Sequence, residues 1–206
     1  MRGHATAEEE ARVRALESRL DPATSSLASL LELALLYQEP CHEEDKAIAL
    51  LEAILERDSS YSLAKIWLAY LHRHYSLDPA SLEKARLLLQ SVPESDRALR
   101  AAALLLLAEI GQGLEDLSAP ELIRLLQASV ALAPTWVANR NLLGWYLAEI
   151  GERDEAAVQI RAALGNIIPL DPASPLAERE FEVSITGRAA HGIADLLESY
   201  LARLGA

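Results

Sequence analysis

The sequence is poor in the residues on which catalytic and metal-binding sites are built. It contains one cysteine, Cys41, and five histidines among 206 residues. A single cysteine excludes an internal disulfide framework, and no apolar leader-like core follows the first residues, so we expect a reducing, cytoplasmic location. No glycine-rich phosphate loop, nucleophile elbow or zinc-protease helix occurs in the chain. We therefore expect a non-catalytic protein with no cofactor and no metal.

Basic residues and long apolar runs are also scarce. Lysine and arginine number 19 against 31 acidic residues, which gives a net charge of −12. This balance disfavours nucleic-acid binding, which needs a basic surface. It is compatible with a basic partner, although solubility alone is the simpler explanation. The most apolar run, Ala101–Ala108, is far shorter than the roughly 20 residues that cross a bilayer, so we expect no membrane association.

Leucine and alanine dominate the sequence, whereas aromatic residues make up only 5% and β-branched residues are sparse. This composition predicts an all-α chain. Its clearest segment, residues 134–172, predicts two helices, at 135–150 and 153–164, separated by a turn at Gly151. The small residues Gly144 and Ala156 would let the two helices pack closely. Four residues share one face of the first helix by spacing: Trp136, Leu143, Leu147 and Ile150.

This segment resembles a tetratricopeptide repeat (TPR), a helix–turn–helix unit of about 34 residues. The residues that carry the resemblance are Leu143, Gly144, Leu147, Gly151, Ala156, Ile160 and Ala163. Three family positions differ. Arg140 stands where the family has tryptophan, Leu147 stands where it has tyrosine, and the closing proline falls near Ile168 and Pro169.

Weaker copies of the pattern precede this segment. The small residues of the first helices are Ala34, Ala69, Ala103 and Gly144, of which the first three are almost equally spaced. The last interval is lengthened by a predicted linker, GQGLEDLSAP, that begins at Gly111. In the second helices the corresponding positions are Ala47, Ala85, Leu122 and Ala156. Such a near-constant period indicates a repeat array.

The resemblance implies a right-handed superhelical array of antiparallel helix pairs, a TPR-like α-solenoid. We divide the chain into an N-terminal tail and helix (1–23), about four helix pairs (24–172) and a C-terminal capping segment (173–206). We expect the first helix at 7–20. The capping helix should bury one stripe of apolar residues: Ile193, Leu196, Leu197, Tyr200, Leu201 and Leu204. Residues 177–186 are expected to be helical, and Pro40 to mark a turn.

The resemblance also implies that the first helix of each pair lines a concave surface that binds a peptide or partner protein. Counting from the small positions gives the candidate partner-binding residues Leu35, Ile66, Tyr70, His74, Arg97, Arg100, Leu104, Asn141 and Trp145. Alternatively, these side chains pack between neighbouring repeats, as large apolar residues usually do. Only Asn141 fits the pattern by which some family members clamp a C-terminal carboxylate, so a chaperone-tail receptor is not expected.

Two other groups of residues were considered for chemistry. His72 and His74 diverge by about 200° on a helix, so they are not expected to chelate one ion. Cys41 and His42 have no third group to orient them as a nucleophile and base. Three function classes therefore remain: a non-catalytic TPR-like adaptor, an acidic inhibitor or escort of a basic partner, and a structural subunit that self-associates, for instance as a homodimer.

Overall fold

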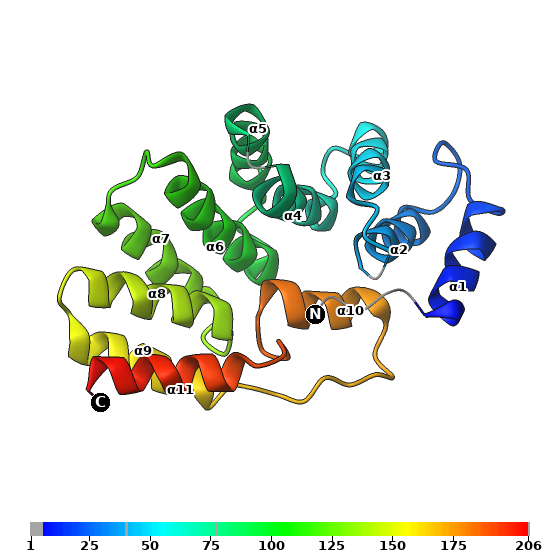
Figure 1. Cartoon of the computed structure of the whole chain (residues 1–206). Helices are drawn as coiled ribbons and strands as arrows, with labels where there is room; N and C mark the ends of the chain where they lie inside the picture. Colours follow the sequence, from blue (N-terminus) through cyan, green and yellow to red (C-terminus); the bar gives the residue numbers. More distant parts are fainter. Residues whose placement is uncertain (1–5, 40, 77, 206) are drawn as a thin grey trace. The chain divides into compact units, whose positions relative to one another are not determined.

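The computed structural model describes residues 6–39, 41–76 and 78–205, and every regular element within them is a helix (Figure 1). The all-α prediction is therefore confirmed. The chain forms two compact units, Met1–Leu88 and Leu89–Ala206, which are described separately below.

None of the helices in these described ranges is both long and apolar enough to cross a membrane.

The first unit contains five α-helices and one π-helical turn. They are α1 (Ala7–Glu17), α2 (Leu27–Gln38), α3 (Glu44–Arg57), α4 (Ser62–Leu71), η1 (His72–Ser76) and α5 (Pro79–Gln90), whose last two residues fall in the second unit. Helices α2 and α3 pack as a helical hairpin, and α4 packs on α3. The predicted turn at Pro40 lies outside the described residues.

Helix α1 packs beside α2 in Figure 1. Thr6 and Glu9 form a reciprocal capping box that satisfies the first amide groups of α1. The helix ends at Glu17, short of the predicted end at Leu20, and it buries only Val13 and Leu16. Because α1 contributes so little apolar surface, it needs polar ties to α2, such as the ion pair between Arg12 and Glu32.

The second unit holds two helix pairs and a C-terminal segment. Its elements are α6 (Arg97–Leu114), α7 (Ala119–Leu132), α8 (Val137–Glu149), α9 (Arg153–Leu164), α10 (Leu176–Glu180), η2 (Phe181–Ile185) and α11 (Ile193–Leu204). Helix α6 packs on α7, α7 on α8, and α8 on α9. This is the stacking expected of helical repeats.

The linker predicted to begin at Gly111, after the first helix of the third pair, was placed too early. Helix α6 continues through Gly111 to Leu114, and its C-cap residue Glu115 adopts the left-handed conformation with φ of 55°. The absence of a side chain at Gly111 explains the extension. A Cβ there would lie 2.3 Å from Leu117 Cδ1, so glycine lets the returning chain pack directly against the last turns of α6.

The α8–α9 hairpin follows the prediction closely. Gly151 makes the turn with φ of +90°. A Cβ on Gly144 would lie 2.8 Å from Ile160 Cδ1, so glycine is required for the close approach of the two helices. Two details were wrong: Trp136 precedes the helix at its N-cap position, and Ile150 is 49% exposed, because the helix ends at Glu149 and the chain turns there.

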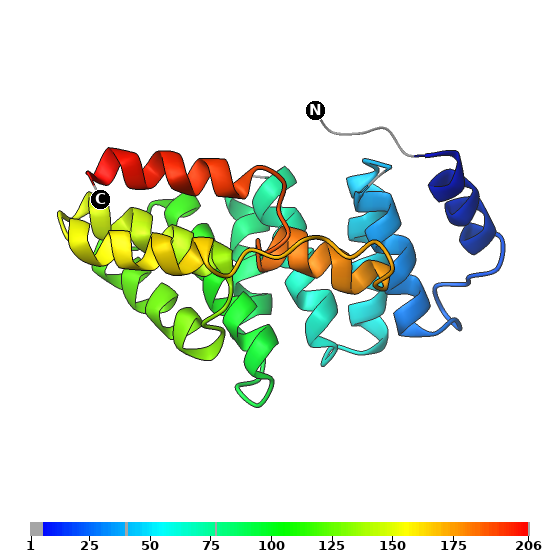
Figure 2. The same ribbon diagram turned by 90° about the horizontal axis from the view of Figure 1, so that it is seen from below.

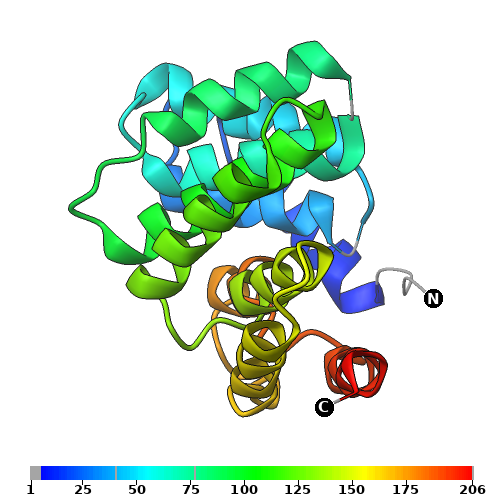
Figure 3. The ribbon, with the colours of Figure 1, turned by 90° about the vertical axis from the view of Figure 1, so that its left-hand side faces the viewer.

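The C-terminal segment returns to the α8–α9 pair, as predicted for a cap. Residues 176–185 are helical, and α11 lies alongside α9 in the second unit, seen lengthwise in Figure 2 and nearly end-on in Figure 3. Leu197 is fully buried in a cluster with Val137, Ile160 and Ala163. The predicted stripe was wrong at Leu196, which is 51% exposed because it lies about 100° around the helix from Leu197.

The repeat positions inferred from spacing are all buried. In the first helices of the pairs, Ala34, Ala69, Ala103 and Gly144 lie inside the structure, and so do Ala47, Ala85, Leu122 and Ala156 in the second helices. At every one of these positions except Leu122 the residue is small, which lets paired helices approach closely. The recurring spacing therefore reflects a recurring packing geometry.

Candidate functional site

The first unit carries four of the predicted partner-binding residues. Leu35 on α2 and Ile66 on α4 are 1% and 0% exposed, so in this conformation their side chains are part of the core. Tyr70 is half-buried and His74 is exposed. The rings of Tyr70 and His74 lie 4.3 Å apart, and the Tyr70 ring also meets Trp67 edge-on at 5.6 Å. The structure thus brings Tyr70 and His74 together as an aromatic pair at the end of α4.

The second unit carries the other five predicted residues on α6 and α8. Leu104 is 8% exposed, whereas Arg97 is exposed at the first residue of α6. Arg100 is half-buried, and its Nη1 donates a hydrogen bond to the Val92 carbonyl at 3.4 Å. Within α6, therefore, Arg97 is the predicted residue whose side chain is most open to a partner.

On α8, Asn141 and Trp145 lie one turn apart and share a face of the helix. Asn141 is half-buried and Trp145 is 38% exposed. The Trp145 ring meets the buried Tyr146 ring edge-on, with centroids 4.8 Å apart. The indole therefore contacts one aromatic neighbour and is also open to solvent. A single groove that contains all nine residues stays a prediction, because they are divided between the two units.

A buried polar network anchors α8, and sequence analysis missed it. Asn139 is 0% exposed, and its Nδ2 donates to Ser129 Oγ at 3.2 Å and to the Ala133 carbonyl at 3.1 Å. The Ser129 hydroxyl in turn donates to the Ala101 carbonyl at 2.9 Å. Through Ser129, Asn139 thereby links α8 to α7 and α6, and α6 and α8 carry five of the predicted binding residues. The sequence contained one signal for this network, because Asn139 is a polar residue on the face of the helix that was expected to be buried.

We expect Asn139→Ala to lower the free energy of unfolding by about 1–3 kcal/mol, because it leaves the Ala133 carbonyl buried without this donor. Urea unfolding followed by circular dichroism measures the change. Asn141→Ala, farther along the same helix and half-buried, is the matched control and should change stability by about 0.5 kcal/mol or less. Equal losses in the two variants would contradict the role of the network.

The start of α8 is also fixed by the C-terminal segment. The backbone N–H groups of Val137 and Ala138 both donate to the Thr186 carbonyl at 2.9 Å. Trp136 packs edge-on against Phe181, with ring centroids 5.6 Å apart. Since the first amide groups of a helix lack partners within it, this one carbonyl caps α8 from a segment that follows α9 in the chain. The cap fixes the position of the helix that carries Asn141 and Trp145.

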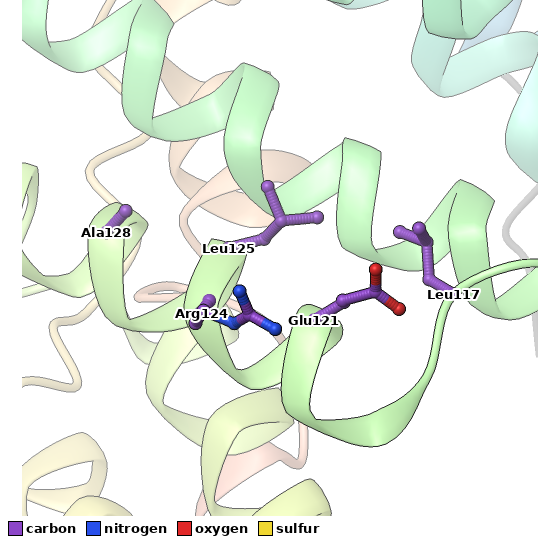
Figure 4. Close-up of a pocket in the computed structure, with 5 residues that line it drawn as sticks. All are labelled: Leu117, Glu121, Arg124, Leu125 and Ala128. Carbon is purple, nitrogen blue, oxygen red and sulfur yellow. The ribbon is translucent and has the colours of Figure 1, made fainter.

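A shallow pocket of about 320 Å³ lies along α7 (Figure 4), lined by Leu117, Glu121, Arg124, Leu125 and Ala128. Its two charged side chains already form hydrogen bonds with residues three or four positions earlier in the chain. Glu121 accepts hydrogen bonds from the Ser118 backbone and hydroxyl, which lower the pKa of its carboxyl group. Arg124 Nε donates to the Pro120 carbonyl at 3.3 Å. These groups stabilise the start of α7, so the pocket offers little directed chemistry to a ligand.

The remaining reactive side chains do not form a catalytic constellation. Among the residues that the structure describes, no group of three histidine, cysteine or acidic side chains could hold a metal ion. Burial is the main cause of a raised pKa of the Cys41 thiol, and the negative charge of Glu43 raises it further. The thiol is therefore a poorer nucleophile near neutral pH. His72 is 5% exposed, and burial lowers its pKa, whereas His74 is exposed. The two histidines therefore diverge, as their spacing predicted.

No protein-family model matches the chain, and no curated protein matches it in sequence. Solved structures do match it. The crystal structure of MamA is 20% identical, with a TM-score of 0.60 over 77% of this chain and 88% of that one. MamA residues 41 to the end from Desulfovibrio magneticus RS-1 are 18% identical, with a TM-score of 0.57 over 78% and 86%.

A third similar structure covers nearly the whole chain. YrrB, described as a TPR protein with an unusual peptide-binding site, is 21% identical, with a TM-score of 0.52 over 95% of this chain and 93% of its own. Structural matches at such low sequence identity show the fold alone. The function has to be argued from the surface of this chain. Together with the recurring helix pairs and their buried small positions, these matches show that the chain has the TPR-like helical-repeat fold.

Proposed function

We propose that this chain is a non-catalytic protein-interaction module that binds a peptide or partner protein through the exposed face of its first helices. The observation that carries the proposal is Trp145, a large aromatic side chain that is 38% exposed on the first helix of its pair. Tryptophan is among the residues most enriched at the energetic centres of protein interfaces. A module that only needed a stable fold would gain more by burying this indole.

The chemistry of Trp145, of its neighbours on α8 and of the other exposed predicted residues suits a peptide. Asn141 lies one turn before it and supplies both a donor and an acceptor for backbone groups. The Tyr146 ring contacts the indole edge-on, which adds an aromatic surface beside it. Arg97 on α6 is an exposed cation that suits an acidic residue of the partner. In the first unit, Tyr70 and His74 form a second aromatic element of the same kind. YrrB, which shares the fold, is described as having a peptide-binding site.

The test is a partner capture from the source organism's own lysate, followed by affinity measurement on the captured partner. Trp145→Ala should weaken binding by about 30-fold or more, the effect of removing an aromatic centre worth about 2 kcal/mol. Val158→Ala is the control, since Val158 is 51% exposed on α9, the second helix of the same pair. Circular dichroism of both variants should match the parent chain. Unchanged affinity in Trp145→Ala would refute binding at this face.

The net charge of −12 favours a second candidate, an acidic inhibitor or escort of a basic partner. Such binding depends on exposed charge, which salt screens over about 8 Å at physiological ionic strength. Affinity for the captured partner should then fall steeply as salt rises and should change little in Trp145→Ala. The adaptor proposal expects the opposite pattern, so the two measurements together separate the candidates.

A further inference from the structure

Trp145 shares its face of α8 with a carboxylate that is not paired. Glu149 follows Trp145 by four residues, so the two side chains lie one turn apart on the same side of the helix. Both residues are exposed. Within the described ranges, the side chain of Glu149 forms neither an ion pair nor a hydrogen bond. An open indole and an available carboxylate are therefore presented together.

The position of Glu149 at the end of α8 strengthens its preference for a cation. Glu149 is the last residue of the helix, and the last turn contains no basic residue. The aligned peptide dipoles place partial negative charge at this end of a helix. The stretch that begins with Glu149 and ends at residue 155 contains four acidic residues and one basic residue, Arg153. The other charged residue of α8, Arg140, lies near its start and donates to the Pro134 carbonyl.

Arg203 on α11 lies in the same region but leaves the carboxylate available. The Tyr200 hydroxyl is 3.5 Å from the Gly144 carbonyl oxygen, which brings α11 beside α8. The Arg203 guanidinium lies over the Tyr200 ring, 5.8 Å from its centroid. Burial is the main cause of the raised pKa of Tyr200; the charge of Glu149 raises this pKa further, and Arg203 lowers it. As far as the structure describes the chain, Arg203 and Glu149 form no ion pair.

We propose that Trp145 and Glu149 together bind an arginine side chain of the partner. The guanidinium lies on the exposed indole and donates to the Glu149 carboxylate. A planar guanidinium can do both, because its face stacks on an aromatic ring while the N–H groups at its edge donate to an acceptor. The inference rests on the function proposed above, since it names one side chain that the exposed face of α8 recognises.

Capped amino acids test the arginine site without the partner. The full chain carries isotope-labelled tryptophan and gives three indole N–H signals by NMR, one from each tryptophan. Trp67 and Trp136 are buried, so their signals are internal references for the Trp145 signal. The probes are acetyl-arginine amide and acetyl-citrulline amide, which has a neutral urea group in place of the guanidinium. Substitution of Trp145 by phenylalanine assigns its signal.

The arginine probe should shift the Trp145 indole signal in a saturable manner and leave the two reference signals in place. It should bind at least about fivefold more tightly than the citrulline probe, because only the guanidinium carries the charge that the ring and the carboxylate attract. Equal binding of the two probes would overturn the proposal. So would the absence of a saturable shift.

Three variants locate the charge that is recognised. Glu149→Gln should weaken binding of the arginine probe by about fivefold. Glu198→Gln is the matched control and should not, because Glu198 is exposed on α11 about 200° around the helix from Tyr200. Arg203→Gln should change the affinity by less than about twofold. An increase of fivefold or more in that variant would mean that Arg203 already occupies the carboxylate, which would overturn the proposal.

The captured partner separates this inference from the proposed function. Glu149→Gln should weaken the partner by about fivefold, and Glu198→Gln should not. If Trp145→Ala weakens the partner and Glu149→Gln does not, the face binds the partner without an arginine, and only this inference fails. If neither variant weakens the partner, both proposals fail.

A second copy of the chain is the competing occupant. If it covered this face, the Trp145 indole signal would move with protein concentration in the absence of any probe, and sedimentation would show a dimer. That result would overturn the proposal. A concentration-independent signal, combined with an arginine preference that Glu149→Gln removes, would support it.

Discussion

Replacing Leu197 with alanine is expected to lower the free energy of unfolding of the second unit by about 2–5 kcal/mol. Leu197 is 0% exposed and packs with Val137, Ile160 and Ala163, so alanine leaves a cavity between α11 and the α8–α9 pair. A terminal helix of a repeat array covers apolar surface that would otherwise face water. Amide hydrogen exchange should therefore quicken in α9 as well as in α11, because the same cluster holds both helices.

The adjacent Leu196 supplies the matched control. It is chemically identical and 51% exposed, so Leu196→Ala should change the free energy of unfolding by about 0.5 kcal/mol or less. Urea unfolding of both variants gives the comparison. If the two alanine variants were equally stable, α11 would not act as a cap on the second unit.

The same two residues show what the sequence can predict about a helix. Its apolar residues located a helix within the predicted capping segment, because leucine spacing on a helix is a strong local signal. They could not say which of two adjacent leucines faces the core. That choice depends on how α11 meets α9, where Val137, Ile160 and Ala163 converge on one point of its surface. Residues distant in sequence set this angle, and local periodicity does not contain it.

The candidate binding face was predictable to a similar extent. Trp145 lies about 200° around the helix from Leu143, which predicts that it points away from the core, and its side chain is 38% exposed. Counting from the small positions also selected Leu35 and Ile66, which are 1% and 0% exposed. Position on a helix gives the direction of a side chain but not what covers that side. The Thr186 carbonyl that caps α8 was likewise invisible, since it comes from a segment distant in sequence, beyond the end of α9.

Gly144, the small residue at the centre of the clearest repeat, is the site of the second large expected effect on stability. Gly144→Val should lower the free energy of unfolding by about 3 kcal/mol, the upper range for overpacking a core. Even a Cβ would lie 2.8 Å from Ile160 Cδ1 and 3.2 Å from the Ala156 carbonyl oxygen. Gly165→Val is the control, because a Cβ there meets nothing closer than 3.7 Å and its residue is exposed. Urea unfolding measures both variants.

Ile160→Val distinguishes overpacking from a general intolerance of substitution at Gly144. Shortening Ile160 removes the Cδ1 atom that a new side chain would meet first, and alone it should cost about 0.5–1.5 kcal/mol. If the contact with Ile160 Cδ1 sets the distance between the helices, the double variant Gly144→Val/Ile160→Val should be less destabilised than the sum of the two single variants. The expected difference is about 1 kcal/mol. Strict additivity would mean that the Ala156 backbone sets the spacing instead. In that case the small residue on the first helix is required by the partner helix itself, and no change in its side chains could compensate for losing it.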